Sequence, residues 1–324
     1  MKDITSLSAL QLSAAIHARS VSCRATMEAY LSRIDTVNPA INALVSLREP
    51  KALLTEADQA DRELAAGRSR GWMHGFPFAI KDLSEAKGLP CTFGSMNYAD
   101  FVPDFDDIHV ERIRAAGAIF IGKSNAPEMG LGSHTYNSVF GATRNPYDLS
   151  RSAGGSSGGA AAAIAAGLVP LADGSDMMGS LRNPAAFNNV IGFRPTFGRV
   201  PALGNELYLG QFSVTGPMGR RVEDVAALLQ TQAGYDFRDP LSLDDEDLTL
   251  GPLSDFAGAR IGWLGDYHGY LPFEPGVLEL CESALGVLAG MGLVIEEVPR
   301  DSTWTGSGRP GGYSGISSSP TARG

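Results

Sequence analysis

The fold of this chain is decided by the stretch from Ala153 to Arg199, which reads AGGSSGGAAAAIAAGLVPLADGSDMMGSLRNPAAFNNVIGFRPTFGR. An Ala-rich segment lies between two Gly/Ser-rich turns, at 154–159 and 174–180. Glycine adopts backbone conformations that other residues avoid, so such turns bring main-chain amides and small hydroxyls close to another group. Ser156 and Ser180 are the side chains that these turns present. We predict that this pair carries the chemistry, together with a lysine far upstream.

The composition is that of an ordinary globular protein with an acidic balance. The 324 residues suffice for one large α/β domain or two smaller ones, with 44% hydrophobic and 19% charged residues. The formal net charge is −10, and acidic residues are concentrated between Asp236 and Asp255. A nucleic-acid partner would need a basic patch, so we expect none.

Cysteine usage and hydropathy indicate a cytoplasmic location. Cys23, Cys91 and Cys281 are odd in number, and no two of them have metal-ligand spacing. The first twenty residues lack the continuous apolar core of a secretory signal. The longest apolar run, 160–172, is broken by Gly167 and Pro170 and is too short to span a bilayer, so we expect no membrane span.

Alternating strand and helix patterns predict an α/β fold with helices on both faces of a mixed sheet. The expected helices cover 51–66, 107–116, 222–234 and 275–291, and the expected strands 76–81, 118–122, 261–264 and 293–298. The segment 132–148 reads as a loop. Residues 261–298 therefore form one more βαβ unit.

Lys81 ends the apolar run FPFAIK at 76–81. Buried parallel strands read as continuous apolar segments, and ligands gather at their carboxyl ends. From position alone, two interpretations are about equally good: a functional lysine, or a strand-end lysine that extends its ammonium into water.

Two common kinds of site, a phosphate site and a Ser-His-Asp triad, are disfavoured at the Gly/Ser turns. Neither GxxxxGK[ST] nor GxGxxG is present, and no lysine follows the first turn, so a phosphate site is disfavoured. There is no GxSxG motif, and none of the five histidines lies within the Gly/Ser block, which disfavours a Ser-His-Asp triad. His134 is the histidine to keep in view, because its loop leads towards the block.

The motifs of the chain resemble those of the amidase signature family of Ser-Ser-Lys hydrolases. GGSSGG at 154–159 is followed, 24 residues after Ser156, by Ser180 in GSDMMGSLRNPAAF. Further matches are FAIKD at 78–82, GKSNAPE at 122–128, GATRNPYD at 141–148 and GFRPTFGRVP at 192–201. The resemblance extends to about Pro299. It implies one α/β/α domain, residues 1–300, around a mixed, mostly parallel sheet.

The resemblance also implies a role for each residue at the two turns. Ser180 is the expected nucleophile, and Ser156 bridges it to Lys81, the base, with a cis peptide bond expected between Gly155 and Ser156. The expected oxyanion hole consists of the main-chain N–H groups of Met177, Met178, Gly179 and Ser180. Ser157 is expected to support this network by hydrogen bonding. Neither a cofactor nor a metal is implied.

The residues around the expected nucleophile allow further predictions. Asp176 and Arg182 flank Ser180, and we favour an ion pair that holds the turn over contact with substrate. Met178 stands where the family usually has glycine. A methionine there adds a side chain beside the acyl pocket, and it is costly if the position requires a positive φ.

The C-terminal sequence departs from the family. Of the 24 residues from Asp301 to Gly324, 17 are Gly, Ser, Thr or Pro, which predicts a disordered tail, either natural or the product of a frameshift or truncation. Family members continue well beyond position 300, so the resemblance implies that the C-terminal part of the domain is lacking.

Three functions remain open from the sequence. The first is hydrolysis of a small carboxylic amide to acid plus ammonia or amine, with a small-molecule amide as partner and a homo-oligomer left open. The second is an inactive, truncated remnant of the family. The third is a glutaminase-type subunit of an amidotransferase complex.

Overall fold

The computed structural model describes residues 3–204, 210–252 and 256–298. The chain divides into two compact units, Met1–Leu250 and Gly251–Gly324, and each is described by itself. The Gly/Ser-rich segment expected at 301–324 lies outside the described residues. Within those that are described, no helix combines the length and apolar character needed to cross a membrane.

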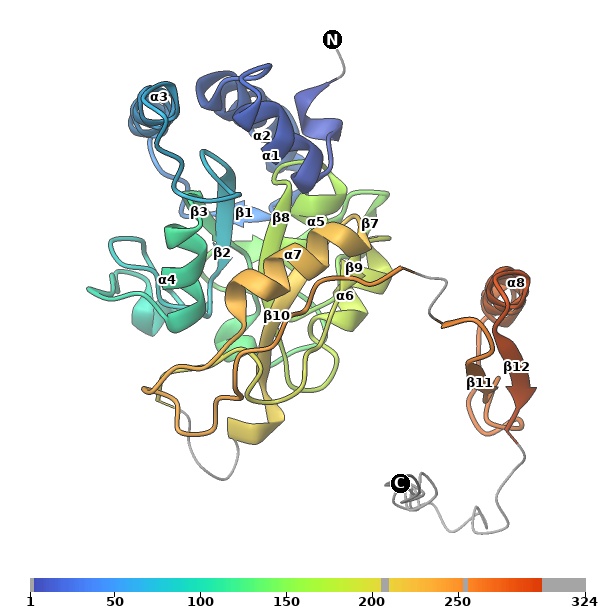
Figure 1. Ribbon diagram of the computed structural model, residues 1–324. Coiled ribbons are helices and arrows are strands. Elements are labelled where there is room, and N and C mark those ends of the chain that lie inside the picture. Colours follow the sequence, from blue (N-terminus) through green and yellow to red (C-terminus); the bar gives the residue numbers. More distant parts are fainter. Residues whose placement is uncertain (1–2, 205–209, 253–255, 299–324) are drawn as a thin grey trace. The chain divides into compact units, whose positions relative to one another are not determined.

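The larger unit holds most of the secondary structure (Figure 1). Its α-helices are α1 (Ala9–His17), α2 (Cys23–Ile41), α3 (Pro50–Ala65), α4 (Ile108–Ala115), α5 (Gly158–Ala165), α6 (Arg182–Phe187) and α7 (Val222–Gln232). Its strands are β1 (Leu44–Val45), β2 (Pro77–Lys81), β3 (Ile119–Ser124), β4 (Tyr136–Asn137), β5 (Gly141–Ala142), β6 (Arg144–Asn145), β7 (Asp148–Ser152), β8 (Leu171–Asp176), β9 (Ile191–Gly192) and β10 (Val214–Gly219). Its described residues also form the 3₁₀ helices η1 (Ile4–Ser6), η2 (Met96–Tyr98), η3 (Glu128–Gly130) and η4 (Gly210–Phe212).

Local sequence explains how several helices begin. At α1, the Ser8 hydroxyl accepts the Gln11 N–H and the Gln11 side chain accepts the Ser8 N–H, both at 3.1 Å, which is a capping box. At α2, the Ser22 hydroxyl accepts the Ala25 N–H at 2.9 Å. Pro50 stands at the start of α3, where its missing N–H costs nothing.

The central strands form two small sheets, in the orders β1-β3-β2 and β8-β10-β9. Strands β2 and β3 are parallel, whereas β1 pairs with β3, and β10 with β8 and β9, in antiparallel fashion. The two sheets meet at β2 and β8, where the Lys81 N–H donates to Asp173 Oδ1 at 3.0 Å. The α/β class is confirmed, but the expectation of a mostly parallel sheet is not. Strand β10 instead returns beside β8 in the opposite direction.

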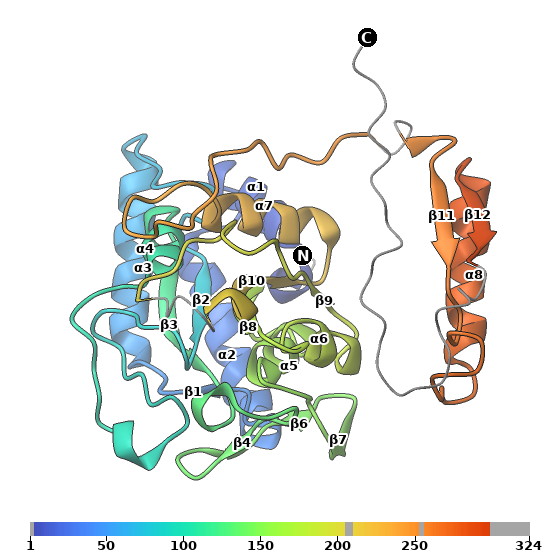
Figure 2. The same cartoon turned by 90° about the horizontal axis from the view of Figure 1, so that it is seen from below.

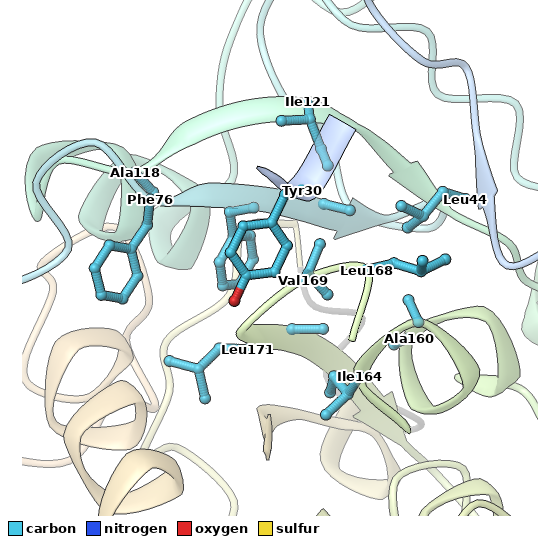
Figure 3. Close-up of a cluster of buried hydrophobic side chains, with 14 of the residues drawn as sticks. Tyr30, Leu44, Phe76, Ala118, Ile121, Ala160, Ile164, Leu168, Val169 and Leu171 are labelled. Atoms are coloured by element: carbon cyan, nitrogen blue, oxygen red, sulfur yellow. The ribbon is translucent and has the colours of Figure 1, made fainter. Parts of the chain in front are cut away.

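Helices cover both sides of these strands. Figure 2 shows α4 and α7 on one side of β2, β8 and β10, and α5 and α6 on the other. The buried core includes Tyr30 of α2, Leu44 of β1, Ile121 of β3 and Ile164 of α5 (Figure 3). Burial of apolar side chains of this size stabilises a fold by about 1.5–3 kcal/mol each.

At Gly159, helix α5 lies against main-chain atoms of neighbouring segments. A Cβ atom added at Gly159 would lie 2.3 Å from the main-chain nitrogen of Asn125 and 2.6 Å from the carbonyl oxygen of Ala43. The Gly159 N–H donates to the Asn125 carbonyl at 3.1 Å. The first turn of α5 is therefore fixed at contact distance from the end of β3.

In the second unit, the predicted βαβ arrangement is confirmed. Strands β11 (Arg260–Trp263) and β12 (Val294–Glu297) are parallel, and α8 (Val277–Gly290) connects them. Their pairing is reinforced by an ion pair between Arg260 and Glu296.

Candidate functional site

The two Gly/Ser turns and the end of β2 come together in the larger unit. Ser156 and Ser157 immediately precede α5, and Ser180 lies between β8 and α6. The Ser157 N–H donates to the Ser180 carbonyl at 3.2 Å, which joins one turn to the other. The peptide bond between Gly155 and Ser156 is cis, as the resemblance implied.

Lys81 is fully buried and points its ammonium at serine hydroxyls. Its Nζ atom donates to Ser156 Oγ and Ser157 Oγ, each at 2.8 Å, and to Ser175 Oγ at 2.9 Å. These contacts decide between the two interpretations of this residue, because the ammonium does not reach water. Lys81, Ser156 and Ser157 are therefore brought together as expected.

Burial changes the acid–base chemistry of this lysine. Desolvation lowers the pKa of Lys81 from 10.5 to about 7, although the negative charges of Asp173 and Asp176 act in the opposite direction. An amine with a pKa near neutrality exchanges protons readily with neighbouring groups. The Lys81 amine can therefore gain or lose a proton near pH 7.

Ser180 joins the cluster through its main chain only. In the part of the chain that the structure describes, no side-chain hydrogen bond connects Ser156 to Ser180. The Ser180 side chain is half-buried, next to the exposed Met177 and Met178. A hydroxyl at the boundary between the buried lysine and solvent is open to a bound molecule.

The main-chain N–H groups of the second turn differ in availability. The Gly179 N–H donates to Asp176 Oδ1 at 2.8 Å, so this expected oxyanion donor is already bound to a carboxylate. Among the described residues, no acceptor is bound to the N–H groups of Met177, Met178 and Ser180. Within that part of the chain, three of the four expected donors remain free.

Asp176 organises this turn. Its buried carboxylate accepts two hydrogen bonds from Arg182, at 3.0 and 3.1 Å, one from Arg194 at 2.9 Å and one from the Leu181 N–H at 3.2 Å. Burial alone would raise the pKa of Asp176, but the hydrogen bonds, led by those from Arg182, hold it well below its usual range. The expected ion pair between Asp176 and Arg182 is present, and it ties the turn to the start of α6.

Met178 occupies an unstrained position. Only Gly179 has a positive φ in this turn, at 108°, and the Met178 side chain is 83% exposed. The glycine that the family usually has at position 178 is therefore not required by the backbone here.

A surface hollow lies along the segment 127–138. It has a volume of about 660 Å³, and its lining includes Met129, Leu131 and Tyr136. A Cβ atom added at Gly130 would lie 3.8 Å from Ser156 Oγ, so this segment passes close to the first turn. His134 lies nearby, where its Nδ1 atom is 2.8 Å from Ser152 Oγ, but it is exposed.

Sequence reasoning missed three polar residues of the site. Ser175 supplies the third hydroxyl to Lys81, Arg194 is a second cation on Asp176, and Asp173 binds the Lys81 main chain. The sequence contains one pattern that could have identified Ser175 and Asp173 as neighbours of Lys81. They alternate along LADGSD, so their side chains share the face of β8 that meets Lys81.

A family model and curated relatives match most of this chain. The family model described as Amidase matches residues 25–303. An acylamidase of Rhodococcus erythropolis is 40% identical over 318 residues, covering 94% of this chain and 65% of that protein. A glutamyl-tRNA(Gln) amidotransferase subunit of Acidothermus cellulolyticus is 40% identical over 301 residues, covering 92% of this chain and 59% of that protein.

Solved structures give a similar result. A bacterial aryl acylamidase of the amidase signature family has a TM-score of 0.82 at 31% identity, covering 90% of this chain and 61% of that one. The peptide amidase of Stenotrophomonas maltophilia has a TM-score of 0.79 at 33% identity, covering 90% of this chain and 62% of that one. The chain thus spans about three fifths of the length of the proteins that it matches.

Proposed function

Because this chain belongs to the amidase signature family, we propose that it hydrolyses a small carboxylic amide to an acid plus ammonia or an amine. The observation that carries the proposal is the fully buried Lys81, whose ammonium contacts Ser156, Ser157 and Ser175 at 2.8–2.9 Å. A serine hydroxyl is a weak nucleophile near pH 7 and needs an adjacent base. Lys81 has the pKa and the neighbours that such a base requires.

In the proposed reaction, Ser180 Oγ attacks the amide carbonyl carbon, and its proton passes through Ser156 to neutral Lys81. Ser156 suits this relay because a hydroxyl both donates and accepts. The Ser156–Ser180 hydrogen bond forms in the complex with substrate, since catalytic hydrogen bonds often tighten only at that stage. The free N–H groups of Met177, Met178 and Ser180 receive the oxyanion.

The second half of the reaction reverses the proton path. The C–N bond breaks as the leaving nitrogen takes the proton from Lys81 through Ser156, which gives an acyl ester on Ser180. Water then attacks this ester, losing a proton to the same base, and Ser180 is released with the carboxylic acid. Ser157 holds the ammonium of Lys81, while Asp176 and Arg182 hold the turn that carries the donors.

Covalent labelling tests the proposal. The full chain is incubated with a fluorophosphonate probe and then with a panel of acyl p-nitroanilides. We expect one adduct per chain, located on Ser180 by peptide mass spectrometry, and release of nitroaniline from at least one substrate. A folded protein that takes up no probe, or takes it up at another serine, contradicts the assignment.

A second candidate function is supported by the amidotransferase relatives. In that case the chain releases ammonia from glutamine and transfers it within a complex. Glutamine-dependent ammonia release, measured with and without co-purified proteins, separates the two functions. A third alternative, an inactive remnant, is distinguished by non-cooperative thermal unfolding together with the absence of labelling.

The rate is expected to depend on pH through Lys81. The base works only when neutral, and burial places the pKa of Lys81 at about 7. We therefore expect kcat/KM to rise with pH and to level off above about pH 7, rather than near 10.5 as for an exposed lysine. Initial rates between pH 5 and 10 check this. A plateau reached only above pH 9, or a flat profile, contradicts the assigned base.

Substrate range is expected to depend on Met178. Replacing Met178 with Gly removes an exposed side chain beside the proposed oxyanion donors, so bulkier acyl groups should gain rate relative to small ones. Stability should change by no more than about 1 kcal/mol, the usual effect of an added glycine. The measurement is kcat/KM across a graded series of acyl anilides. The matched control is Met96→Gly, also an exposed methionine, and equal profiles for the two variants contradict the prediction.

A further inference from the structure

A buried pair of polar residues, Asp173 and His109, lies next to Lys81, and the reaction described above does not use it. Asp173 of β8 is fully buried and His109 of α4 is 3% exposed. Asp173 Oδ2 lies 3.4 Å from His109 Nε2, yet neither atom makes a hydrogen bond with any residue in the described ranges. A carboxylate withdrawn from water is costly unless other groups compensate its charge.

Strand geometry connects this pair to the base. Asp173 and Ser175 are two residues apart on β8, so their side chains project from the same face. Asp173 Oδ1 accepts the main-chain N–H of Lys81 at 3.0 Å, and Ser175 Oγ accepts from its ammonium at 2.9 Å. One strand therefore holds both ends of the lysine.

Resting on the function proposed above, we propose that Asp173, whose Oδ2 atom faces His109, is a positioning residue for Lys81. It fixes the main chain of the lysine beside the serines, and it keeps a negative charge next to the base. When Lys81 takes the proton of Ser180, a cation forms in a place without water. The Asp173 charge stabilises that cation, and it counteracts the effect of burial on the pKa of Lys81.

Other charged or titratable groups near Lys81 come from several elements. Asp176 of β8 also raises the pKa of Lys81, but less than Asp173 does. Lys123 of β3 donates to the Lys81 carbonyl at 3.4 Å. Asp82 follows Lys81 in the chain and is also buried, and this burial raises its pKa. Helix α5 carries no charged residue.

Asp173→Asn is the decisive variant. The amide oxygen still accepts the Lys81 N–H, but the charge is removed, so Lys81 should lose its proton more easily and become a weaker base. We expect the rising limb of the kcat/KM profile to move to lower pH by about one unit and kcat to fall about tenfold or more. The matched control is Asp224→Asn. This buried carboxylate accepts the main-chain N–H groups of Ala9 and Leu10, far along the chain from Lys81. The proposal is overturned if the rising limb of the kcat/KM profile lies at the same pH in Asp173→Asn as in Asp224→Asn.

His109 provides an independent test if Asp173→Asn does not fold. His109→Leu leaves Asp173 Oδ2 without a facing polar group, whereas His109→Gln offers it an N–H. We expect kcat to fall about tenfold in the Leu variant and to recover largely in the Gln variant. Equal losses in both variants overturn the role assigned to His109.

A readout that does not depend on turnover separates this inference from the proposed function. The side-chain titration of Lys81 is followed by NMR in lysine-labelled protein, with the Lys81 signal identified by its absence from Lys81→Met. A titration moved to lower pH in Asp173→Asn supports the inference even if no amide is hydrolysed. An unmoved titration overturns it even if the wild-type chain is active.

Discussion

Replacing Ser180 with Ala is expected to lower amide turnover by about 10⁴-fold or more and to abolish fluorophosphonate labelling. The loss of a nucleophile in a serine hydrolase has an effect of this size, because the remaining groups only bind and polarise the substrate. Folding should be unaffected, since the Ser180 hydroxyl has no side-chain hydrogen bond among the described residues. Turnover and labelling are measured on the same folded preparation.

The control for this variant is Ser20→Ala, an exposed serine whose hydroxyl donates to the Ala15 carbonyl at 3.0 Å. It should keep full turnover and labelling. Retention of more than a small fraction of turnover in Ser180→Ala would falsify the assignment of the nucleophile. Retained labelling would place the reactive serine elsewhere.

Lys81→Met should lower the rate as much as Ser180→Ala does, and it should keep or raise the stability of the fold at pH 7. Methionine fills much of the same space but cannot accept a proton, so the rate should fall about 10⁴-fold. The pKa of Lys81 drops from 10.5 in the unfolded chain to about 7 in the fold. Between these values the unfolded chain binds more protons, so this residue makes stability rise with pH from about 7 to 10.5.

The same link between proton binding and stability predicts how Lys81→Met changes the stability of the fold. Burying Lys81 costs on the order of 4 kcal/mol at pH 7, and this cost disappears towards pH 10.5. We expect Lys81→Met to unfold at an equal or higher urea concentration at pH 7 and to lose the rise in stability between pH 7 and 10. Urea unfolding at pH 7 and 10 measures both effects.

The matched control is Lys123→Met, on the strand next to β2. Lys123 is also fully buried, but its ammonium donates to the main-chain carbonyls of Ser84 and Lys81 and not to a serine hydroxyl. That variant should be less stable because two carbonyls lose their donor, while its rate per folded molecule stays within about tenfold of wild type. Equal rate losses in the two variants would remove the special role of Lys81.

The sequence predicted those elements whose apolar pattern is unbroken. FPFAI at 76–80 and AIFI at 118–121 are continuous apolar runs, and they lie in the parallel pair β2 and β3. Strands β8 and β10 were missed because LADGSD and VTGPMG contain glycine, proline and aspartate, which disfavour strands. Tertiary pairing between the two overrides that local preference, and it also makes this sheet antiparallel.

The candidate site was predictable to a similar extent. The spacing of Lys81, Ser156 and Ser180 resembled a known family, and Lys81 and Ser156 do meet. The use of the Gly179 N–H by Asp176, and the approach of His109 to Asp173, depend on loop geometry and on helix packing. Neither property has a signature in residue type or spacing.

The contact between Gly159 and the end of β3 limits how this protein can be engineered. A library randomised over α5 should return only glycine at position 159, because any side chain would have to occupy the space of the Asn125 main chain. Moving α5 to make room would carry Ser156 and Ser157 away from Lys81. The exposed positions 129, 131, 136 and 178 carry no such constraint, whereas the contact at Gly159 fixes how far Ser156 and Ser157 lie from Lys81.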